Sequence, residues 1–195
     1  GCPMVLLDSY FDQLPIDTIV INNSQAARNA TRTLIENGHR KIGYLHSAFH
    51  INNFSERKDG FYHEMRQNGL EVSPAFEYKL TPTVDSAYSD MKEILAQDPE
   101  MPTAFFADND IIALSAMRAL KEKGYRIPED ISIIGIDDMP TCVLMDPPLT
   151  TMHVPKHQMG VLAVKRLIEK ISRKSQEILT IQIRTSLTRR SSILN

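Results

Sequence analysis

The sequence comprises 195 residues, of which 42% are hydrophobic and 24% are charged, so the chain can bury a core in one large or two small lobes. Its formal net charge of −2 argues against a general nucleic-acid-binding surface within these residues. No apolar run approaches the roughly 20 residues that a membrane-spanning helix needs, so we expect no membrane partner.

Short apolar runs alternate with helix-like periodic segments along the first half of the chain. An apolar run at 3–7 and a run rich in β-branched residues at 16–21 predict two strands, and further strands are expected at 41–45 and 76–80. Helical periodicity predicts helices that begin at Ser24, Ser55 and Asp85, all of them residue types that cap a helix N-terminus. A helix that begins at Ser55 would place Arg57 in its first turn, near the end of the preceding strand.

The segment 102–138 is predicted to be a strand–helix–strand unit. An apolar run at 103–107 is followed by helical spacing, for which Asp110 is the expected N-cap. A second apolar run at 131–136 shows no polar alternation, which is typical of a strand buried on both faces in a parallel sheet. Because strands and helices alternate throughout, we predict an α/β fold with parallel sheets flanked by helices.

Polar residues follow both strands of this unit at their carboxyl ends. Asn109 follows the first strand, and Asp137-Asp138 follow the second. Ligands of open parallel sheets bind beyond the carboxyl ends of the strands, so Asn109 and Asp137 are expected where a small molecule would bind. As alternatives, the two acids could end a strand and cap a turn, and Asn109 could only shape the turn before the helix.

The last part of the chain is predicted to contain an extended segment at 149–154, a helix from Pro155 and a half-buried strand at 179–183. The apolar face of this helix is expected to comprise Met159, Leu162, Ala163, Leu167 and Ile171. Arg166 is expected on the opposite, solvent-facing side.

No enzyme, metal or cofactor motif is recognisable. The sequence has no nucleophile elbow, no phosphate-binding glycine loop and no nucleophile–base pair at a known spacing, so we expect neither an enzyme nor a cofactor. The histidine pairs His46/His50 and His153/His157 have spacings seen at metal sites. They lack an acidic or thiol companion, and we therefore expect no metal.

The two cysteines, Cys2 and Cys142, form no CxxC pair, and no signal peptide is recognisable. Both features are typical of a cytoplasmic protein with reduced thiols, and we expect that location.

Several motifs occur in the order and spacing typical of one family of bacterial regulators. They are GHRKIGYL at 38–45, SERKDGF at 55–61, PTAFFADNDIIALSAMRAL at 102–120, PEDISIIGIDD at 128–138, PPLTT at 147–151 and RTSLTRRSS at 184–192. Together they resemble the lactose-repressor/galactose-repressor (LacI/GalR) family over essentially the whole chain. The resemblance implies a two-lobed, type I periplasmic-binding-protein-like core.

The resemblance also implies that the chain contains parts of two lobes. Residues 23–152 and the tail 187–195 would form the C-lobe, and residues 1–22 and 153–186 would be remnants of an incomplete N-lobe. Such a remnant has too few elements to cover its own apolar faces, and its sheet has an open edge. We expect that a preceding segment was removed by truncation or proteolysis, and that these strands pair with another chain or are poorly ordered.

Four effector-binding residues follow from matching this chain to the family motifs. Arg57 matches the arginine of S-x-R-x-x-G-[FW], Asn109 the A-N-D turn, Asp137 the first acid of G-[FY]-D-D, and Asp8 the acid that closes an N-lobe strand. A carboxylate accepts from neighbouring hydroxyls, a guanidinium donates a planar fork, and an amide does both, which suits polyhydroxylated or heterocyclic ligands. Outside this motif, Arg57 would be interpreted as a solvated charge.

Three positions depart from the family pattern. Val154 stands where many members have Gln, and Thr81-Pro82 stands where an aromatic side chain often stacks on the ligand. Asp108 replaces a small residue and is expected to add negative charge at the mouth of the site. The arginines at 189–190 are expected in a solvated turn, without contact to DNA.

The function implied by the resemblance is effector sensing and dimerisation in a bacterial DNA-binding transcriptional regulator. A sugar or nucleobase-like (purine-like) molecule bound between the lobes would modulate operator binding through a helix-turn-helix that this chain lacks. An apolar surplus on helix 111–120 and around 142–145 suggests a homodimer interface, with burial in the core as the alternative. The rivals are an extracellular solute-binding protein of a transport system and a regulator that senses a protein.

Overall fold

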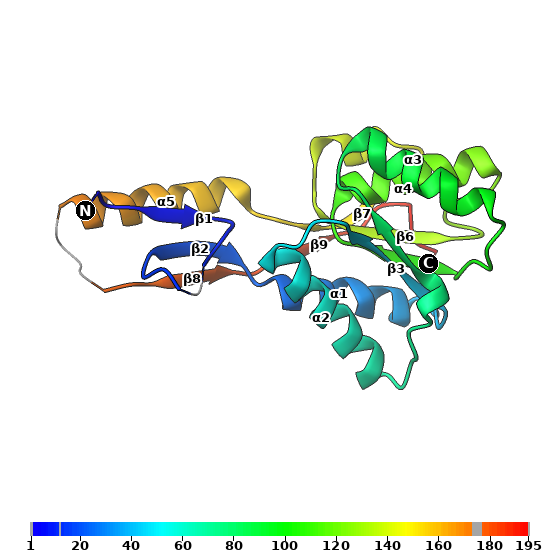
Figure 1. Cartoon of the computed structure of the whole chain (residues 1–195), viewed down its shortest axis with the longest axis horizontal. Helices are drawn as coiled ribbons and strands as arrows, with labels where there is room; N and C mark the ends of the chain where they lie inside the picture. Colours follow the sequence, from blue (N-terminus) through cyan, green and yellow to red (C-terminus); the bar gives the residue numbers. More distant parts are fainter. Residues whose placement is uncertain (1, 12, 173–176, 195) are drawn as a thin grey trace. The chain divides into compact units, whose positions relative to one another are not determined.

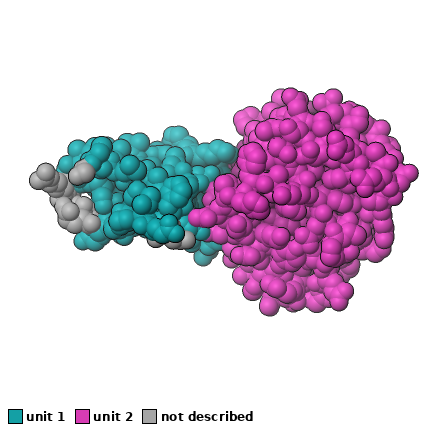
Figure 2. All heavy atoms as spheres, in the orientation of Figure 1, with its two compact units in different colours: residues 1–22, 154–185 teal, residues 23–153, 186–195 magenta. Residues whose placement is uncertain are grey.

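The computed structural model describes residues 2–11, 13–172 and 177–194. They form two compact units that interleave along the sequence (Figure 2). Unit 1 comprises Gly1–Asn22 and Val154–Thr185, and unit 2 comprises Asn23–His153 and Ser186–Asn195. Each unit has its own sheet, three-stranded in unit 1 and six-stranded in unit 2 over the described residues. The interpretation of unit 1 as N-lobe and unit 2 as C-lobe stays a prediction.

Five parallel strands and one antiparallel strand form the sheet of unit 2. In chain order they are β3 (Ile42–Ser47), β4 (Glu77–Leu80), β5 (Ala104–Ala107), β6 (Ser132–Asp137), β7 (Thr150–His153) and β9 (Ser186–Thr188). Their order across the sheet is β4-β3-β5-β6-β7-β9, with β9 antiparallel to β7. The parallel strands confirm the predicted α/β class. The sequence did not predict β9, because a strand of 3 residues shows almost no periodicity.

Helices cover both faces of this sheet. Figure 1 shows α1 (Asn23–Glu36) and α2 (Asn52–Gln67) on one face, and α3 (Val84–Ala96) and α4 (Asp110–Lys123) on the other. Short 3-10 helices, η1 (Pro74–Phe76) and η2 (Pro140–Val143), precede β4 and follow β6. A strand covered on both sides can be apolar throughout, and Ile133, Ile134 and Ile136 of β6 are all fully buried.

The strand order reverses between β3 and β5. From β3 the chain passes through α2 to β4 on one side, and then through α3 to β5 on the other side of β3. Right-handed crossovers in opposite directions place α2 and α3 on opposite faces. Ligands of open α/β sheets bind beyond the carboxyl ends of the strands at such a reversal, so this edge is where a site is expected.

An aromatic stack fixes α2 against the strands at this reversal. Tyr44 of β3 stacks on Phe61 of α2 with ring centroids 4.9 Å apart, and on Phe106 of β5 at 5.3 Å. All three side chains are fully buried. Stacked pairs contribute about 0.5–1.5 kcal/mol beyond the area they bury, so this stack anchors α2 at the edge where β3 and β5 end.

The backbones of α1 and α2 approach each other closely at Gly60. A Cβ atom added at Gly60 would lie 2.3 Å from the carbonyl oxygen of Ser24 and 3.0 Å from the Cβ of Ala27. Only glycine fits this crossing, because any larger residue would have to push the two helices apart.

Helix α2 begins earlier than the sequence predicts. It starts at Asn52, not at Ser55, and its N-cap residue Ile51 makes no side-chain capping bond. Arg57 therefore lies in the second turn of α2, not in the first. A prediction based on capping residue types places this start too late, because the helix begins without a side-chain cap.

The caps of the other helices in unit 2 are also displaced from the predicted positions. Thr83 caps α3 and Asn109 caps α4, each through a side-chain oxygen, so Asp85 and Asp110 lie inside the first turns. Ser24 likewise lies inside α1. In each case the predicted residue is one or two positions into the helix, since several capping residue types occur in a row.

Unit 1 consists of three parallel strands and one helix over the described residues. They are β1 (Val5–Leu7), β2 (Asp17–Ile21), β8 (Thr180–Ile183) and α5 (Lys156–Ile171). The strand order is β1-β2-β8, so β1 and β8 are the edges of the described sheet. Helix α5 packs against β1 and β2. The sequence predicted all four elements.

The predicted faces of α5 were partly wrong. Arg166 was expected in solvent, yet it is buried and pairs with the buried carboxylate of Asp17 at 3.0 Å. Lys170 reaches the same carboxylate at 2.8 Å. Ile171 was expected inside, yet it is 61% exposed. A buried carboxylate on β2 needs cationic partners, and this requirement decides which face of α5 is turned inward.

Large apolar side chains remain exposed in unit 1. They include Leu7, Phe11, Leu14, Val164, Ile168 and Ile178. This surface agrees with the expectation that the segments present cannot cover their own apolar faces.

Candidate functional site

Arg57 projects from α2 and is held by three other elements. Its Nε donates to Oδ1 of Asn23 on α1 at 2.9 Å, and its Nη1 donates to the carbonyl of Asp108 after β5 at 2.5 Å. Its Nη2 lies 3.8 Å from Oδ1 of Asp137 at the end of β6. The side chain is buried, so the interpretation of Arg57 as a solvated charge was wrong. A guanidinium fixed in this way presents its remaining donors with little freedom.

Asn109 is the N-cap residue of α4 and lies two positions after the end of β5. Its Oδ1 accepts from the Ile112 N–H at 2.9 Å, which satisfies one of the free donors of the first turn. The suggestion that Asn109 shapes this turn is therefore correct for the side-chain oxygen. Within the described residues its amide nitrogen makes no hydrogen bond, so two donors remain for a ligand.

Asp137 is the last residue of β6, and its side chain is 27% exposed. Its backbone has φ of 128°, a region that residues with a side chain rarely adopt. At 3.8 Å the Arg57–Asp137 contact is an ion pair and not a hydrogen bond. Strained backbone of this kind is concentrated at ligand sites, and it motivates the same hypothesis here.

The neighbouring Asp138 interacts with other side chains of unit 2. It accepts from Arg190 at 2.6 Å and pairs with His153 at 2.9 Å. Although burial alone would raise it, these hydrogen bonds hold the pKa of Asp138 below its usual value. Arg190 was expected in a solvated turn, yet it also donates to the carbonyl of Leu149 and ties the C-terminal tail to β6 and β7. That expectation was wrong, because its acidic partner is 52 residues distant in the sequence.

Asp108 does not lie at the mouth of a site as the sequence suggested. Only 1% of the residue is exposed, and its Oδ1 accepts from the Tyr44 hydroxyl at 2.5 Å. Its Oδ2 accepts from the Ser47 N–H at 2.6 Å. Burial raises the pKa of this carboxyl to about 6, although both hydrogen bonds and the charge of Arg57 act in the opposite direction. The carboxylate of Asp108 points toward β3 because the Tyr44 hydroxyl and the Ser47 N–H, which donate to it, belong to that strand.

Three of the four predicted site residues therefore lie together. Arg57, Asn109 and Asp137 are connected through the Asp108 carbonyl and the Arg57–Asp137 ion pair, at the carboxyl ends of β5 and β6. Asp8 belongs to unit 1, where it follows β1, is exposed and has φ of 55°. Its participation stays a prediction. Asn23, which orients Arg57, was missed, because no sequence pattern marks it.

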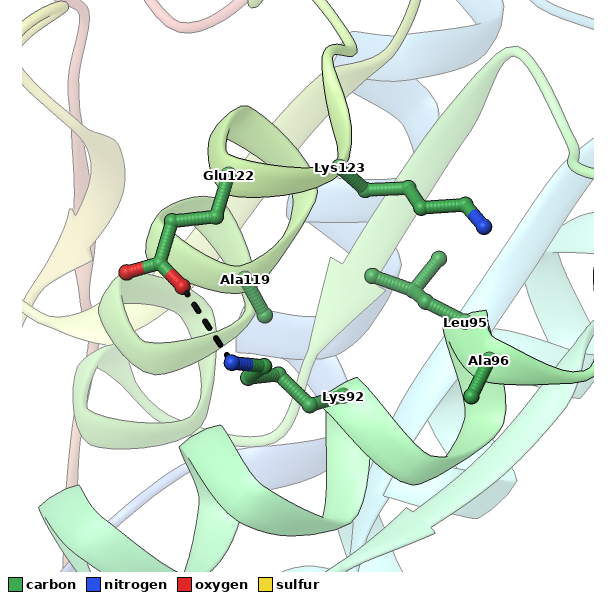
Figure 3. Close-up of a pocket in the computed structure, with 6 residues that line it drawn as sticks. All are labelled: Lys92, Leu95, Ala96, Ala119, Glu122 and Lys123. Carbon is green, nitrogen blue, oxygen red and sulfur yellow. Dashed lines mark ion pairs between the residues drawn. The ribbon is translucent and has the colours of Figure 1, made fainter.

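A hollow elsewhere in unit 2 involves none of these residues. It measures about 260 Å³ and lies between α3 and α4, lined by Lys92, Leu95, Ala96, Ala119, Glu122 and Lys123 (Figure 3). Lys92 pairs with Glu122 at 3.7 Å, and Lys123 pairs with Asp98 at 2.7 Å. Because its charged groups already have partners, we assign no ligand to it.

Within the described residues, no group of three or more His, Cys, Asp or Glu side chains is placed to hold a metal ion. Among the helices of that same part of the chain, none is long and apolar enough to cross a membrane.

The fold and the polar strand ends define an α/β core of the periplasmic-binding-protein type. The family model for the periplasmic binding protein-like domain matches residues 31–193. The chain therefore belongs to this family.

The chain is also similar in sequence to transcriptional repressors. It is 37% identical over 191 residues to the HTH-type transcriptional repressor PurR of Pasteurella multocida, covering 98% of this chain and 57% of the relative. The corresponding PurR of Aliivibrio salmonicida is 36% identical over 191 residues, with coverage of 98% and 57%. The chain thus spans little more than half the length of these relatives.

Solved structures of transcriptional regulators have the same fold as this chain. A transcriptional regulator CelR–cellobiose complex superposes with a TM-score of 0.88 at 28% identity, covering 96% of this chain and 58% of that one. A LacI family regulator from Enterococcus faecium with bound ribose gives 0.88 at 25% identity, with coverage of 98% and 70%. Over the length that it covers, this chain corresponds to the core of LacI/GalR-type regulators.

Proposed function

We propose that this chain senses a small effector, a sugar or purine-like molecule, within a bacterial transcriptional regulator. The observation that carries the proposal is the Arg57–Asp137 pair, a buried guanidinium 3.8 Å from a partly exposed carboxylate at the carboxyl edge of the sheet. Asn109 adds amide donors beside it. Such a set matches a ligand with adjacent hydroxyls or a ring that both donates and accepts hydrogen bonds.

In the intact regulator, the effector would shift an equilibrium between states that differ in operator affinity. DNA would be bound by a helix-turn-helix outside this chain, in the cytoplasm, and no chemical reaction would be catalysed. Coupling between effector and operator is typically about 1–3 kcal/mol, enough to change affinity roughly fivefold to 150-fold. Relatives named as repressors support this role.

We further propose that unit 2 forms the dimer contact of the regulator. An apolar groove of about 250 Å³ lies between α3, α4 and η2, and is lined by Val84, Tyr88, Ile111, Leu114, Ser115, Arg118, Met139, Thr141 and Met145. Beside it, Val143 and Leu144 are 55% and 80% exposed. An exposed apolar surface of this kind on a folded unit is typical of a protein contact.

A thermal-shift screen of sugars and purine bases on this chain tests the sensing proposal. We expect that a compound raises the melting temperature of the unmodified chain and of the exposed control Glu129→Ala, but not of Asp137→Ala. If the same compound stabilises Asp137→Ala equally, the assigned site is wrong. If no sugar or purine binds to the folded chain, a protein partner becomes the better explanation.

A further inference from the structure

Asp108 is a buried carboxylate at the reversal of strand order between β3 and β5. Its side chain contacts β3, through Tyr44 at 2.5 Å and Ser47 at 2.6 Å. The Oγ of Ser47 in turn accepts from the Phe49 N–H at 3.0 Å, so the carboxylate sets the turn by which the chain leaves β3. Its own peptide carbonyl accepts from Nη1 of Arg57. One residue therefore joins β3, β5 and the Arg57 guanidinium.

We propose that Asp108 is a positioning residue for the effector site, which holds Arg57 in place only while its carboxylate is ionised. The inference rests on the proposed effector-sensing function, since it concerns how the same site is oriented. Asp108 itself does not touch the ligand in this account. It acts through Arg57 and through the turn after β3.

The hydrogen-bond pattern requires the ionised form. Both Asp108 oxygens act as acceptors, one for the Tyr44 hydroxyl and one for the Ser47 N–H. A proton added to Oδ2 would point at the Ser47 N–H, and because both groups are then donors, this hydrogen bond would be lost. A proton added to Oδ1 would force the buried Tyr44 hydroxyl to reverse and leave its own hydrogen without this acceptor. Protonation thus breaks one of the two bonds, and it also removes the charge that attracts Arg57.

The other ionisable groups around Asp108 are few. On β3 they are Tyr44, whose pKa is raised well above its usual value by burial and by Asp108, and His46, whose pKa is lowered by burial. Helix α2 contributes Arg57 and Lys58, whose charges both lower the pKa of Asp108. Asp137 of β6 lies on the far side of Arg57. Of these groups, His46 is the one that could titrate in the same range, so it needs its own control.

NMR of this chain between about pH 5 and pH 8 tests the inference without a ligand. We expect the Ser47 amide and the Arg57 Nε–H resonances to shift together, with a midpoint near pH 6, the value to which burial raises the pKa of Asp108. In Asp108→Asn both resonances should be constant and lie near the low-pH values of the unmodified chain, because the amide, like the protonated acid, offers one acceptor and one donor and does not titrate. Resonances that stay constant in the unmodified chain, or titrate equally in Asp108→Asn, would overturn the proposal.

Two further variants separate Asp108 from its neighbours. Tyr44→Phe removes a hydrogen bond to the ionised form, so the midpoint should move upward. His46→Gln should leave the midpoint unchanged. A transition that disappears in His46→Gln would assign it to the histidine and refute the role of Asp108.

Binding completes the test. For a sugar or purine found in the thermal-shift screen, affinity should fall about tenfold from pH 7.5 to pH 5 in the unmodified chain and stay constant in Asp108→Asn. Affinity independent of pH in both would contradict the positioning role while leaving effector sensing intact. If no compound binds, the proposed function fails, and the NMR titration alone decides whether Asp108 orients Arg57.

Discussion

Arg57 shows how one side chain can gather several elements into a site. Its guanidinium reaches α1 through Asn23, β5 through the Asp108 carbonyl and β6 through Asp137, although these residues are far apart in the sequence. Burying a charge among partners on three elements is favourable only if each partner is in place. The orientation of Arg57 is therefore set by the fold itself before any ligand binds.

Replacing Arg57 by Lys should impair binding while preserving the charge. An ammonium cannot satisfy Asn23, the Asp108 carbonyl and Asp137 with one planar fork. Losing one charged hydrogen bond corresponds to about 1.5–3 kcal/mol, or a roughly tenfold to 150-fold weaker affinity by calorimetry for an effector identified by screening. Arg66→Lys, on an exposed site of the same helix, is the matched control and should bind normally. Equal affinities for the unmodified chain and Arg57→Lys would remove Arg57 from the site.

Asp108 should also make folding stability depend on pH in a recognisable direction. Burial raises the pKa of its carboxyl from the ordinary 3.8 to about 6, so the folded chain binds this proton more tightly than the unfolded chain does. Its contribution therefore stabilises as the pH falls through 6 and levels off below 3.8. Relative to Asp108→Asn, the unmodified chain should gain about 1 kcal/mol of unfolding free energy between pH 7.5 and pH 5.

Urea titrations at the two pH values measure this difference. Asp110 has a raised pKa too, owing to burial, but it is present in both chains and cancels. A difference that stays flat, or that changes in the opposite sense, would show that Asp108 does not carry this proton.

The sequence could predict that Arg57, Asn109 and Asp137 lie close together, because each lies in a recognisable motif near the end of a strand or the start of a helix. It could not foresee the burial of Asp108 or the half-buried position of Arg190. Their partners, Tyr44 for Asp108 and Asp138 for Arg190, are 64 and 52 residues away along the chain. Such pairings depend on tertiary contacts, on which local spacing carries no information.

Helices α1 and α2 approach each other closely at Gly60, and Asn23 of α1 accepts a hydrogen bond from Arg57 of α2. Glu64 of α2 strengthens the crossing, accepting from Arg32 at 2.8 Å and from Arg28 at 3.2 Å. Although burial alone would raise it, these arginines hold the pKa of Glu64 below its usual value. The contribution of this network to stability is therefore lost only as the pH falls through that lowered pKa.

Two glycine-to-alanine substitutions should have opposite effects on stability. Gly60→Ala places a methyl group 2.3 Å from the Ser24 carbonyl and should destabilise the chain by about 1–3 kcal/mol. Gly160→Ala, inside α5, meets nothing within 4 Å and should stabilise by about 0.5–1 kcal/mol, because alanine favours the helix. Thermal and urea unfolding of both variants measure these differences. A stabilising Gly60→Ala would mean that α1 and α2 do not approach as described.

Elements with strong patterns were predicted better than their ends. The apolar runs of β3, β5 and β6 predicted buried parallel strands, because a short run without polar alternation is typical of a strand that is covered on both faces. Helix starts were displaced because runs such as Asp108-Asn109-Asp110 offer several capping residues, and only backbone geometry selects one. The inward face of α5 was predicted wrongly because the apolar periodicity takes no account of Asp17. This buried carboxylate pairs with Arg166 and Lys170, so their side of α5 is turned inward.

At the scale of the whole molecule, we propose that two copies of the chain associate through the groove between α3, α4 and η2. This groove belongs to unit 2, whereas α5 of unit 1 presents a separate set of exposed apolar side chains, including Val164 and Ile168. Both surfaces are apolar enough to drive self-association. Substitutions confined to one surface distinguish them.

Leu144→Glu should reduce dimerisation measured by sedimentation equilibrium. Leu144 is 80% exposed, so a charge there should leave the fold intact while opposing burial in an interface. The matched change Val164→Glu, at a position 58% exposed in unit 1, should leave the dimer intact. If Val164→Glu dissociates the dimer and Leu144→Glu does not, the contact lies in unit 1 and the assignment to the groove is wrong.

The most direct test of the central claim is the set of NMR shifts that a bound effector produces on this chain. A sugar or purine that binds should move the Arg57 Nε–H and the Asn109 side-chain amide most strongly, with the Asp137 backbone amide close behind. Shifts centred instead on the hollow between α3 and α4, with Arg57 and Asn109 unchanged, would contradict the account.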